Sequence, residues 1–333
     1  MNAGTPRPVL YSIKHTTNKG LGVFATQEIH KGTRITCEHA LLTVPREPGT
    51  IDPLAVYEAF EALKPQDQST YLELSASQVQ IDHALACIDD DVSDDIRNHI
   101  AKLGSIFECN AFNIGDEDEE TGIVKAGIFP IAARFNHDCK PNVAQTWNEN
   151  LQCLTIHAIR HIDKGEELCD SYVPLCQPSA ARKEELRAYG FECECSVCGS
   201  PRAELRKSDE QRAMIRRLGE DLQFYANRRR GSWLGPISPS LVRGGQEDPL
   251  NVVRYIEYLL QDEGLEGHDL GQYYSFASWY CSTRSTGDLE ESIEWQQKLF
   301  DFNNTIKGGD HEDTIRSKEL LDNLLKQRSA SYE

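Results

Sequence analysis

The sequence lacks any apolar stretch of the ~20 residues that a helix needs to span a bilayer. It also lacks a segment that resembles a secretory signal peptide. From these two absences we expect a soluble intracellular protein, cytoplasmic or nuclear or both, that has no membrane partner.

Positive charge is scarce as well, because 35 Lys and Arg residues face 53 Asp and Glu residues and the formal net charge is −18. Such a surface repels nucleic acid, so we expect no direct nucleic-acid binding, and it attracts basic partners such as histone tails. High solubility accounts for the same charge equally well. The run 116–120 reads in the same two ways, as a solvated loop or as an acidic lip for a lysine-rich substrate.

Cysteine, in contrast, is abundant. The chain has 11 cysteines, an odd number, and three of them are crowded into residues 193–198. Without a secretory signal, this pattern favours reduced thiols and metal binding over a disulfide framework. The 333 residues, 39% of them hydrophobic, suffice for two or three domains at about 150 residues each, and we expect a monomer.

The densest polar segment, Asn136-His137-Asp138-Cys139-Lys140-Pro141-Asn142, follows the apolar run 128–133 directly. Buried polar groups must be paired, so this heptapeptide either caps local turns or meets a ligand. Taken alone it reads as an Asx-rich turn that a proline ends. Three further segments change that interpretation: Gly20-Leu21-Gly22-Val23-Phe24-Ala25, Gly165-Glu166-Glu167-Leu168-Cys169-Asp170-Ser171-Tyr172 and Tyr189-Gly190-Phe191-Glu192-Cys193-Glu194-Cys195-Ser196-Val197-Cys198.

In their order along the chain (20–25, 136–142, 165–172 and 189–198), the four segments resemble the SET-domain protein lysine methyltransferases. The resemblance spans roughly 10–199. Within that family the chain resembles the SMYD-like branch, whose SET domain is split by a MYND zinc finger and followed by a helical domain. The region of the finger contains no suitable run of Cys and His. The implied fold is α+β: a β-rich SET domain with a helical insertion, a zinc-binding post-SET loop and a TPR-like α-helical C-terminal domain.

Local patterns predict the elements of this architecture. We expect strands over 9–13 and 21–25, a strand, turn and strand over 29–35, and a hairpin that joins 143–147 to 151–159. Helices are expected over 56–63 and 71–79, and another with Ile96, Ile100, Leu103 and Phe107 on one face. The expected domains are 1–50 (SET, first part), 51–108 (helical insertion), 109–178 (SET, second part), 179–200 (post-SET zinc loop) and 201–333 (helical C-terminal domain), the last with a basic linker over 228–245.

Cys193, Cys195 and Cys198 place three thiols in one short loop, whereas a structural zinc site needs four ligands. The resemblance implies Cys139 as the fourth ligand, which would clamp the loop against the polar heptapeptide. Glu192 or Glu194 could take the place of Cys139 as the fourth ligand. Alternatively, the three cysteines could be free thiols in a turn, with no metal bound.

The resemblance also implies a site for S-adenosylmethionine. The turn of Gly20, Leu21 and Gly22 would hold its methionine part, and Phe191 would stack on its adenine. Asn136, His137 and Asn110 would contact the cofactor. Asn113 is the alternative to Asn110 for this contact. Alternatively, the ring of Phe191 or of Tyr189 could simply pack within the zinc loop and contact no ligand. The candidate cofactor contacts are Gly20, Leu21, Gly22, Asn110, Asn136, His137, Tyr172 and Phe191.

Methyl transfer to lysine requires an amine whose proton has been removed, although the free side chain has a pKa of about 10.4. An apolar channel beside a sulfonium would lower that pKa through desolvation and like-charge repulsion. Tyr172 is the candidate catalytic residue that would position the methyl group and the amine, and Tyr189 and Phe112 would line the channel. Glu166 and Glu167 would support the chain crossing of the family's knotted core.

The function that we expect is S-adenosylmethionine-dependent methylation of lysine in histones or other basic proteins. Two alternatives remain open at this point. One is a module that binds the cofactor or a peptide but catalyses no reaction. The other is a SET scaffold used for a small-molecule substrate.

Overall fold

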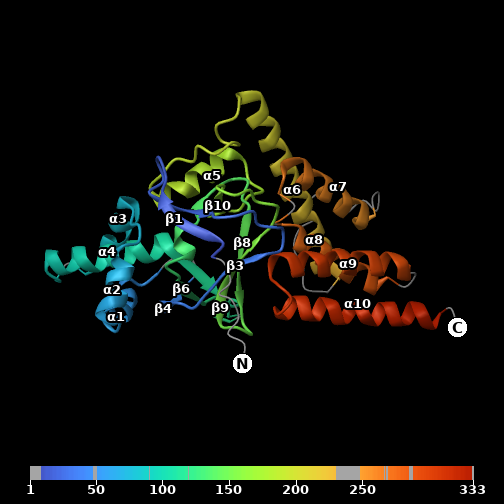
Figure 1. Ribbon diagram of the computed structural model, residues 1–333, viewed down its shortest axis with the longest axis horizontal. Helices are drawn as coiled ribbons and strands as arrows, with labels where there is room; N and C mark the ends of the chain where they lie inside the picture. The colour runs from blue at the N-terminus through green and yellow to red at the C-terminus, as the bar shows by residue number, and fades with distance from the viewer. Residues whose placement is uncertain are drawn as a thin grey trace.

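The computed structural model describes residues 9–47, 51–89, 91–118, 120–229, 248–265, 267, 269–284 and 288–331, with only the backbone described at 228 and 229. A central β-rich body lies between two groups of helices (Figure 1). The blue and cyan helices, α1 to α4, form one group, and the orange and red helices, α7 to α10, belong to the other. The predicted α+β class is confirmed.

Three small sheets form the central body. Their apolar strand residues face a shared core that includes Val23, Ile29, Phe129 and Leu168. The first sheet has the order β1 (Tyr11–His15), β2 (Leu21–Ala25), β10 (Glu167–Asp170), β7 (Asn136–His137). The others are β3 (Arg34–Glu38), β9 (Cys153–Ala158), β8 (Val143–Asn148) and β4 (Leu42–Arg46), β6 (Val124–Ile128), β5 (Ala111–Ile114).

The predicted hairpin is confirmed, since β8 and β9 pair antiparallel from Val143 opposite Ala158 to Asn148 opposite Cys153. In the first sheet, β7 pairs parallel with β10, with Asn136 opposite Cys169 and His137 opposite Asp170. This two-residue pairing places the polar heptapeptide beside the segment that leads to Tyr172.

One cysteine expectation is wrong. Cys37 and Cys153 form a disulfide between β3 and β9, with their Cα atoms 5.8 Å apart, so the thiols are not all free. The two residues are 116 positions apart in the sequence, and only the pairing of β3 with β9 brings them together. The crowded cysteines of 193–198 remain outside any disulfide.

The helical insertion lies between β4 and β5, and its helices pack on Val44, Ala126 and Ile128 of the third sheet. The helix predicted over 71–79 is wrong, because one helix ends at Leu72 and the next begins at Gln78 after the N-cap Ser77. The longest helix of the insertion buries Ile100, Leu103 and Phe107 as predicted. The helices are α1 (Pro53–Glu61), α2 (Pro65–Leu72), α3 (Gln78–Ala86) and α4 (Asp94–Asn110).

Two details of α4 also differ from expectation. Ile96 lies on the exposed side, with 51% of its surface accessible, because only the later turns of α4 reach the sheet. The helix continues through Asn110, which was expected on a strand, and β5 begins at Ala111. The Asn110 side chain therefore projects from the last turn of α4 rather than from a strand.

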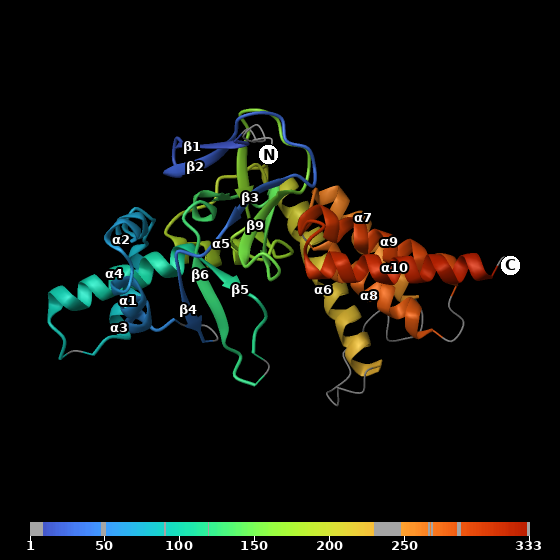
Figure 2. The same cartoon turned by 60° about the horizontal axis from the view of Figure 1, so that its bottom comes forward.

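After β10, α5 (Ser179–Leu186) leads into a short 3-10 turn and the cysteine-rich loop. The C-terminal helices then pack around Ile215, Leu260, Ala277 and Trp295, and Figure 2 shows them on the side opposite the insertion. No helix in the described part of the chain is long and apolar enough to cross a membrane. Of the linker predicted over 228–245, residues 228 and 229 instead belong to α6, and 230–245 lie outside the described residues. The helices are α6 (Arg202–Arg229), α7 (Pro249–Glu263), α8 (Leu270–Thr283), α9 (Leu289–Ile306) and α10 (Glu312–Ala330).

The turn between α9 and α10 attaches the C-terminal helices to the central body. Asp310 accepts hydrogen bonds from both terminal nitrogens of Arg34, the first at 2.8 Å, and from Asn148 Nδ2 at 3.0 Å. Its backbone oxygen accepts from Asn150 at 2.8 Å. Next to this pair, His157 Nε2 lies 3.1 Å from Arg34 Nε, where it accepts a hydrogen bond.

This arrangement predicts an acid-sensitive contact. Burial, and after it the adjacent Arg34, lower the pKa of His157 to about 4, whereas an unfolded histidine has a pKa of about 6.5. Between these values the unfolded chain binds a proton that the native chain does not. His157 therefore makes native stability fall by up to about 3 kcal/mol as pH drops from about 6.5 to about 4.

We expect His157→Gln, whose side-chain oxygen can still accept from Arg34, to flatten this pH dependence. Urea unfolding across that pH range measures it. The control is His83→Gln, on an exposed face of α3, which should leave the slope of stability against pH unchanged. Equal slopes for wild type and His157→Gln would contradict the prediction.

Candidate active site and metal centre

A cavity of about 490 Å³ lies where the turn before β2, the start of β7, the end of α4 and the cysteine-rich loop meet. This volume is in the range of small-molecule sites. Ten of the residues singled out in the sequence line it: Gly20, Leu21, Asn110, Asn136, His137, Tyr172, Tyr189, Phe191, Cys193 and Cys195.

Asn136 joins two of the motifs at the wall of this cavity. Its side-chain nitrogen donates to the Leu21 carbonyl oxygen at 3.1 Å and to Glu167 Oε1 at 2.8 Å. In the same way, Asn142 Nδ2 donates to Glu166 Oε1 at 3.0 Å. The two glutamates thus accept hydrogen bonds from the two asparagines of the heptapeptide, where β7 meets β10.

Gly20 and Gly22 are glycines for different structural reasons. Gly20 has a φ of +72°, a left-handed conformation that glycine adopts without strain. Gly22 leaves room for other groups, because a Cβ there would stand 2.8 Å from both Asn136 Nδ2 and Glu167 Oε1. The close approach at Gly22 is therefore to the protein's own side chains, and Gly22 is not among the residues that line the cavity.

His137 connects the candidate metal centre to Tyr172. Its Nδ1 accepts a hydrogen bond from the Tyr172 backbone N–H at 3.1 Å, so the ring proton lies on Nε2, which is 3.3 Å from Cys139 Sγ. Burial is the main reason that the pKa of His137 falls to about 4, which keeps the ring neutral. A neutral ring with this tautomer donates to the sulfur and accepts from the backbone at the same time.

Aromatic rings make up one side of the cavity. Tyr172 and Tyr189 have ring centroids 4.9 Å apart, and Phe191 meets Tyr172 edge-on at 6.2 Å. The Tyr172 hydroxyl donates to the Phe135 carbonyl oxygen at 2.8 Å. Burial raises the pKa of the Tyr172 phenol, so it stays protonated at neutral pH, with its oxygen lone pairs still able to accept.

The sulfur atoms of Cys139, Cys193, Cys195 and Cys198 all lie within 4.8 Å of one another. Cys139 Sγ is 3.6 Å from Cys198 Sγ and 4.0 Å from Cys193 Sγ. Thiolates that bind zinc tetrahedrally at about 2.3 Å are ~3.8 Å apart, so the cluster fits such an ion. Glu192 and Glu194, the alternative ligands, instead accept from Lys183 and Asn18 and lie outside the cluster.

Two fully buried arginines approach Cys139 from the helices that follow. Arg182 of α5 donates from Nε to Cys139 Sγ at 3.3 Å and also contacts the Gln177 carbonyl oxygen. Four thiolates around one divalent ion carry a net charge of −2. A buried guanidinium beside them offsets part of that charge, which is costly in a low-dielectric interior.

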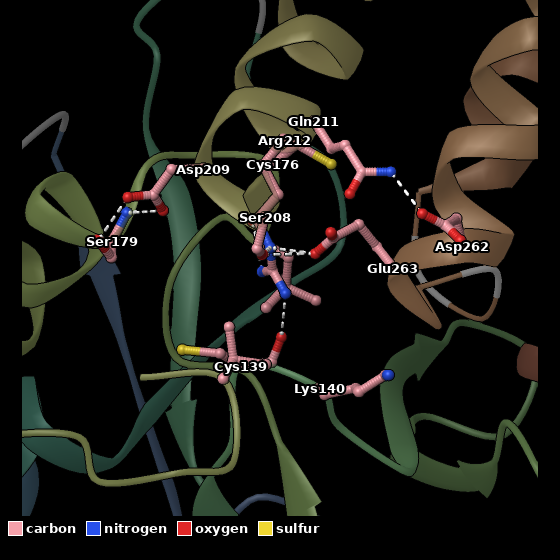
Figure 3. A network of polar contacts seen from close by, with 12 residues as sticks. Cys139, Lys140, Cys176, Ser179, Ser208, Asp209, Gln211, Arg212, Asp262 and Glu263 are labelled. Carbon is pink, nitrogen blue, oxygen red and sulfur yellow. Dashed lines mark hydrogen bonds and ion pairs between the residues drawn. The ribbon is translucent and has the colours of Figure 1, made fainter. Parts of the chain in front are cut away.

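Arg212 of α6 reaches the backbone of the same cysteine. Its side chain donates to the Cys139 carbonyl oxygen at 3.1 Å, to the Leu175 carbonyl oxygen at 2.9 Å and to Glu263 of α7 at 2.9 Å. Figure 3 shows Arg212 between Glu263 and Cys139, so the C-terminal helices hold the backbone of a candidate metal ligand.

Two predicted neighbours of the cavity lie elsewhere. Phe112, expected in the substrate channel, packs on Phe129 with ring centroids 6.0 Å apart and is not among the lining residues. Asn113, the competitor of Asn110, is exposed and borders a different hollow. Neither of these two β5 residues lines the cavity that Asn110 reaches from α4.

Sequence reasoning missed several residues of the site. Lys19 and Arg134 bring two cationic groups to the cavity wall, and Lys19 Nζ is 3.1 Å from Glu167 Oε2. The position of Lys19 directly before Gly20 could have identified it from the sequence as a residue of the site. Arg182 and Arg212 carried no such signal, because they lie on surface-patterned helices and only the packing buries them.

The Arg212 contact yields a stability prediction. Replacing Arg212 by methionine leaves Glu263 buried without its partner, which should cost about 3–5 kcal/mol of unfolding free energy. In the double variant Arg212→Met/Glu263→Gln, the loss should be smaller than the sum of the two single losses. Urea unfolding of the four proteins measures the coupling. Arg216→Met, on the exposed side of α6, is the matched control and should cost under about 1 kcal/mol. Additive losses would contradict the predicted coupling.

Comparison with known proteins agrees with this geometry. Residues 20–173 match the family model described as SET domain. The histone-lysine N-methyltransferase set5 of Schizosaccharomyces pombe is 31% identical over 207 residues, which are 61% of this chain and 54% of that protein.

Two vertebrate proteins named N-lysine methyltransferase SMYD2 match a shorter part. The Gallus gallus protein is 36% identical and the Homo sapiens protein 37% identical, each over 113 residues that cover 34% of this chain and 24% of the relative. The matches therefore span about half of Set5 and about a quarter of SMYD2. Residues 20–173 are thus similar to a SET domain, and the chain is similar to the proteins named as the lysine methyltransferases set5 and SMYD2.

Proposed function

We propose that the chain is an S-adenosylmethionine-dependent methyltransferase that modifies lysine side chains of histones or other basic proteins. The observation that carries the proposal is the meeting of Asn136, His137, Tyr172 and Phe191 around one cavity beside a four-cysteine cluster. The names of the relatives support the same activity.

In this proposal Cys139, Cys193, Cys195 and Cys198 hold one structural zinc ion. The ion fixes the loop that carries Tyr189 and Phe191 against the heptapeptide, as a closed site of four protein ligands does. His137 Nε2 and Arg182 Nε each donate to Cys139, an outer layer of hydrogen bonds that orients this ligand.

The cavity has groups that suit each part of S-adenosylmethionine. Phe191 offers an aromatic face for the adenine, and Lys19 and Arg134 offer positive charge for the carboxylate. The backbone of Gly20 and Leu21, together with Asn136, would border the methionine part, and Asn110 would add an amide. Bound there, the cofactor supplies the methyl group and its electrophilic carbon.

The protein's contribution to the transfer is orientation and desolvation. Tyr172 and Tyr189 place two aromatic faces at one end of the cavity, where a lysine side chain would be excluded from water and its pKa lowered. The protonated Tyr172 cannot serve as a base at neutral pH, so its oxygen would position the amine and the methyl group instead. The lysine proton would leave to solvent before the transfer.

The charge of −18 supports a basic substrate. The domain boundaries, the monomeric state, the absence of nucleic-acid partners and the cytoplasmic or nuclear location stay predictions. So does the choice between protein lysine and a small-molecule acceptor, which the experiments below address.

The first test is calorimetric titration of the zinc-loaded protein with S-adenosylmethionine and with S-adenosylhomocysteine. Stacking of a base on an aromatic ring contributes about 1–3 kcal/mol, so Phe191→Ala should weaken binding by about 5-fold to about 150-fold. Phe112→Leu, outside the cavity, should bind like wild type. If folded, metal-loaded wild type binds neither compound, the methyltransferase proposal fails.

The second test concerns Tyr172. Tyr172→Phe keeps the ring but removes the oxygen, and we expect about a 100-fold loss of kcat with little change in cofactor affinity. Methyl transfer to lysine-rich histone peptides measures the rate, and Tyr258→Phe, on an exposed face of α7, is the matched control. Cofactor binding without transfer to any peptide would favour a binding module or a small-molecule acceptor.

A further inference from the structure

A second group of potential metal ligands lies on the surface, away from the cavity. It is built around a single antiparallel bridge between Ile29 and Ile162, which exchange two backbone hydrogen bonds of 2.9 Å each. Both isoleucine side chains are buried, at 1% and 0% exposure. The bridge therefore fixes two loops, 28–32 and 161–165, against the core at one point.

The geometry of a bridge determines where the flanking side chains go. Side chains alternate along extended chain, so residues 28, 30, 161 and 163 face away from the core when 29 and 162 face into it. The bridge is a hydrogen-bonded pair, so the pairs on each side are of the non-hydrogen-bonded type, with Cα atoms about 4.5 Å apart. His30 then stands opposite His161, and Glu28 opposite Asp163.

The side chains lie as this alternation requires. Glu28, His30 and His161 are exposed, and their ligand atoms all lie within 4.8 Å of one another. His161 Nε2 is 3.1 Å from Glu28 Oε1 and 3.5 Å from Asp163 Oδ1. The two imidazole rings have centroids 5.7 Å apart and are inclined by 40°.

We propose that Glu28, His30 and His161 bind a divalent transition-metal ion, with Asp163 or water completing the coordination. Nitrogen or oxygen ligands bound tetrahedrally at about 2.0–2.1 Å are ~3.3 Å apart, which small rotations of exposed side chains achieve here. Two imidazoles and a carboxylate are a ligand set for Zn²⁺, Ni²⁺ or Cu²⁺. Arg160, directly before His161 in the sequence, forms an ion pair with Glu166.

An ordinary surface ion pair between Glu28 and His161 is the competing explanation. Such a pair contributes at most about 1 kcal/mol and does not involve His30. The metal site, in contrast, requires both imidazoles, and this difference decides between the two explanations.

Binding there would clamp one end of the first sheet. The loop 161–165 leads through Glu166 into β10. Just before that strand, the Gly165 N–H donates to the Ala25 carbonyl oxygen at 2.8 Å, and the Ala25 N–H donates to the Glu166 carbonyl oxygen at 2.9 Å. Glu167, the next residue, holds Asn136 at the cavity. An ion that ties the two loops together would therefore stabilise the pairing of β2 with β10 and raise the melting temperature.

The test uses the 333-residue chain equilibrated with one equivalent of Zn²⁺, dialysed, and then titrated with Ni²⁺ in a calorimeter at about pH 7.5. We expect one additional ion per chain. His30→Ala and His161→Ala should each weaken its binding at least about tenfold, and the exposed control His83→Ala should not.

Two results would overturn the proposal: no additional ion bound by wild type, or unchanged binding in the double variant His30→Ala/His161→Ala. Loss of binding in His161→Ala, with binding by His30→Ala unaffected, would also reject it, because the ion would then be bound without His30. Broadening of the His30 and His161 ring signals by paramagnetic Ni²⁺ in the NMR spectrum of wild type gives a second readout that needs no variant. Signals that stay sharp would count against the site.

Discussion

Cys139 is held from four directions, and the arrangement of the candidate site depends on it. Its sulfur lies within 4.0 Å of Cys193 and Cys198 and accepts from His137 and Arg182, while its carbonyl oxygen accepts from Arg212. The cysteine-rich loop, β7, α5 and α6 are thereby joined at one buried residue. A change in the position of Cys139 would move the aromatic rings and the heptapeptide together.

Much of the site could be predicted because its residues stand in short local motifs. Glycine at 20 and 22, the two asparagines of the heptapeptide, and the three spaced cysteines each carry a signal that does not depend on distant packing. The hairpin of β8 and β9 was predictable for the same reason, since alternation and turn residues are local. Ten of the predicted residues consequently meet at one cavity.

What could not be predicted arises from contacts between distant parts of the chain. The disulfide of Cys37 and Cys153 needs the pairing of β3 with β9, and nothing near either cysteine indicates it. Arg182 and Arg212 stand in helices rich in charge, where a solvent-facing position is the natural expectation. Phe112 and Asn110 are two residues apart, but the change from helix to strand between them sends only Asn110 to the cavity.

The two attachments of the C-terminal helices have a mechanical consequence. Asp310 anchors the turn before α10 to Arg34, and Arg212 anchors α6 to the backbone of Cys139. A hinge rotation about either anchor would break the other, which is a buried, charge-assisted contact at Arg212. The C-terminal helices are therefore held rigidly against the central body rather than free to swing as a lid.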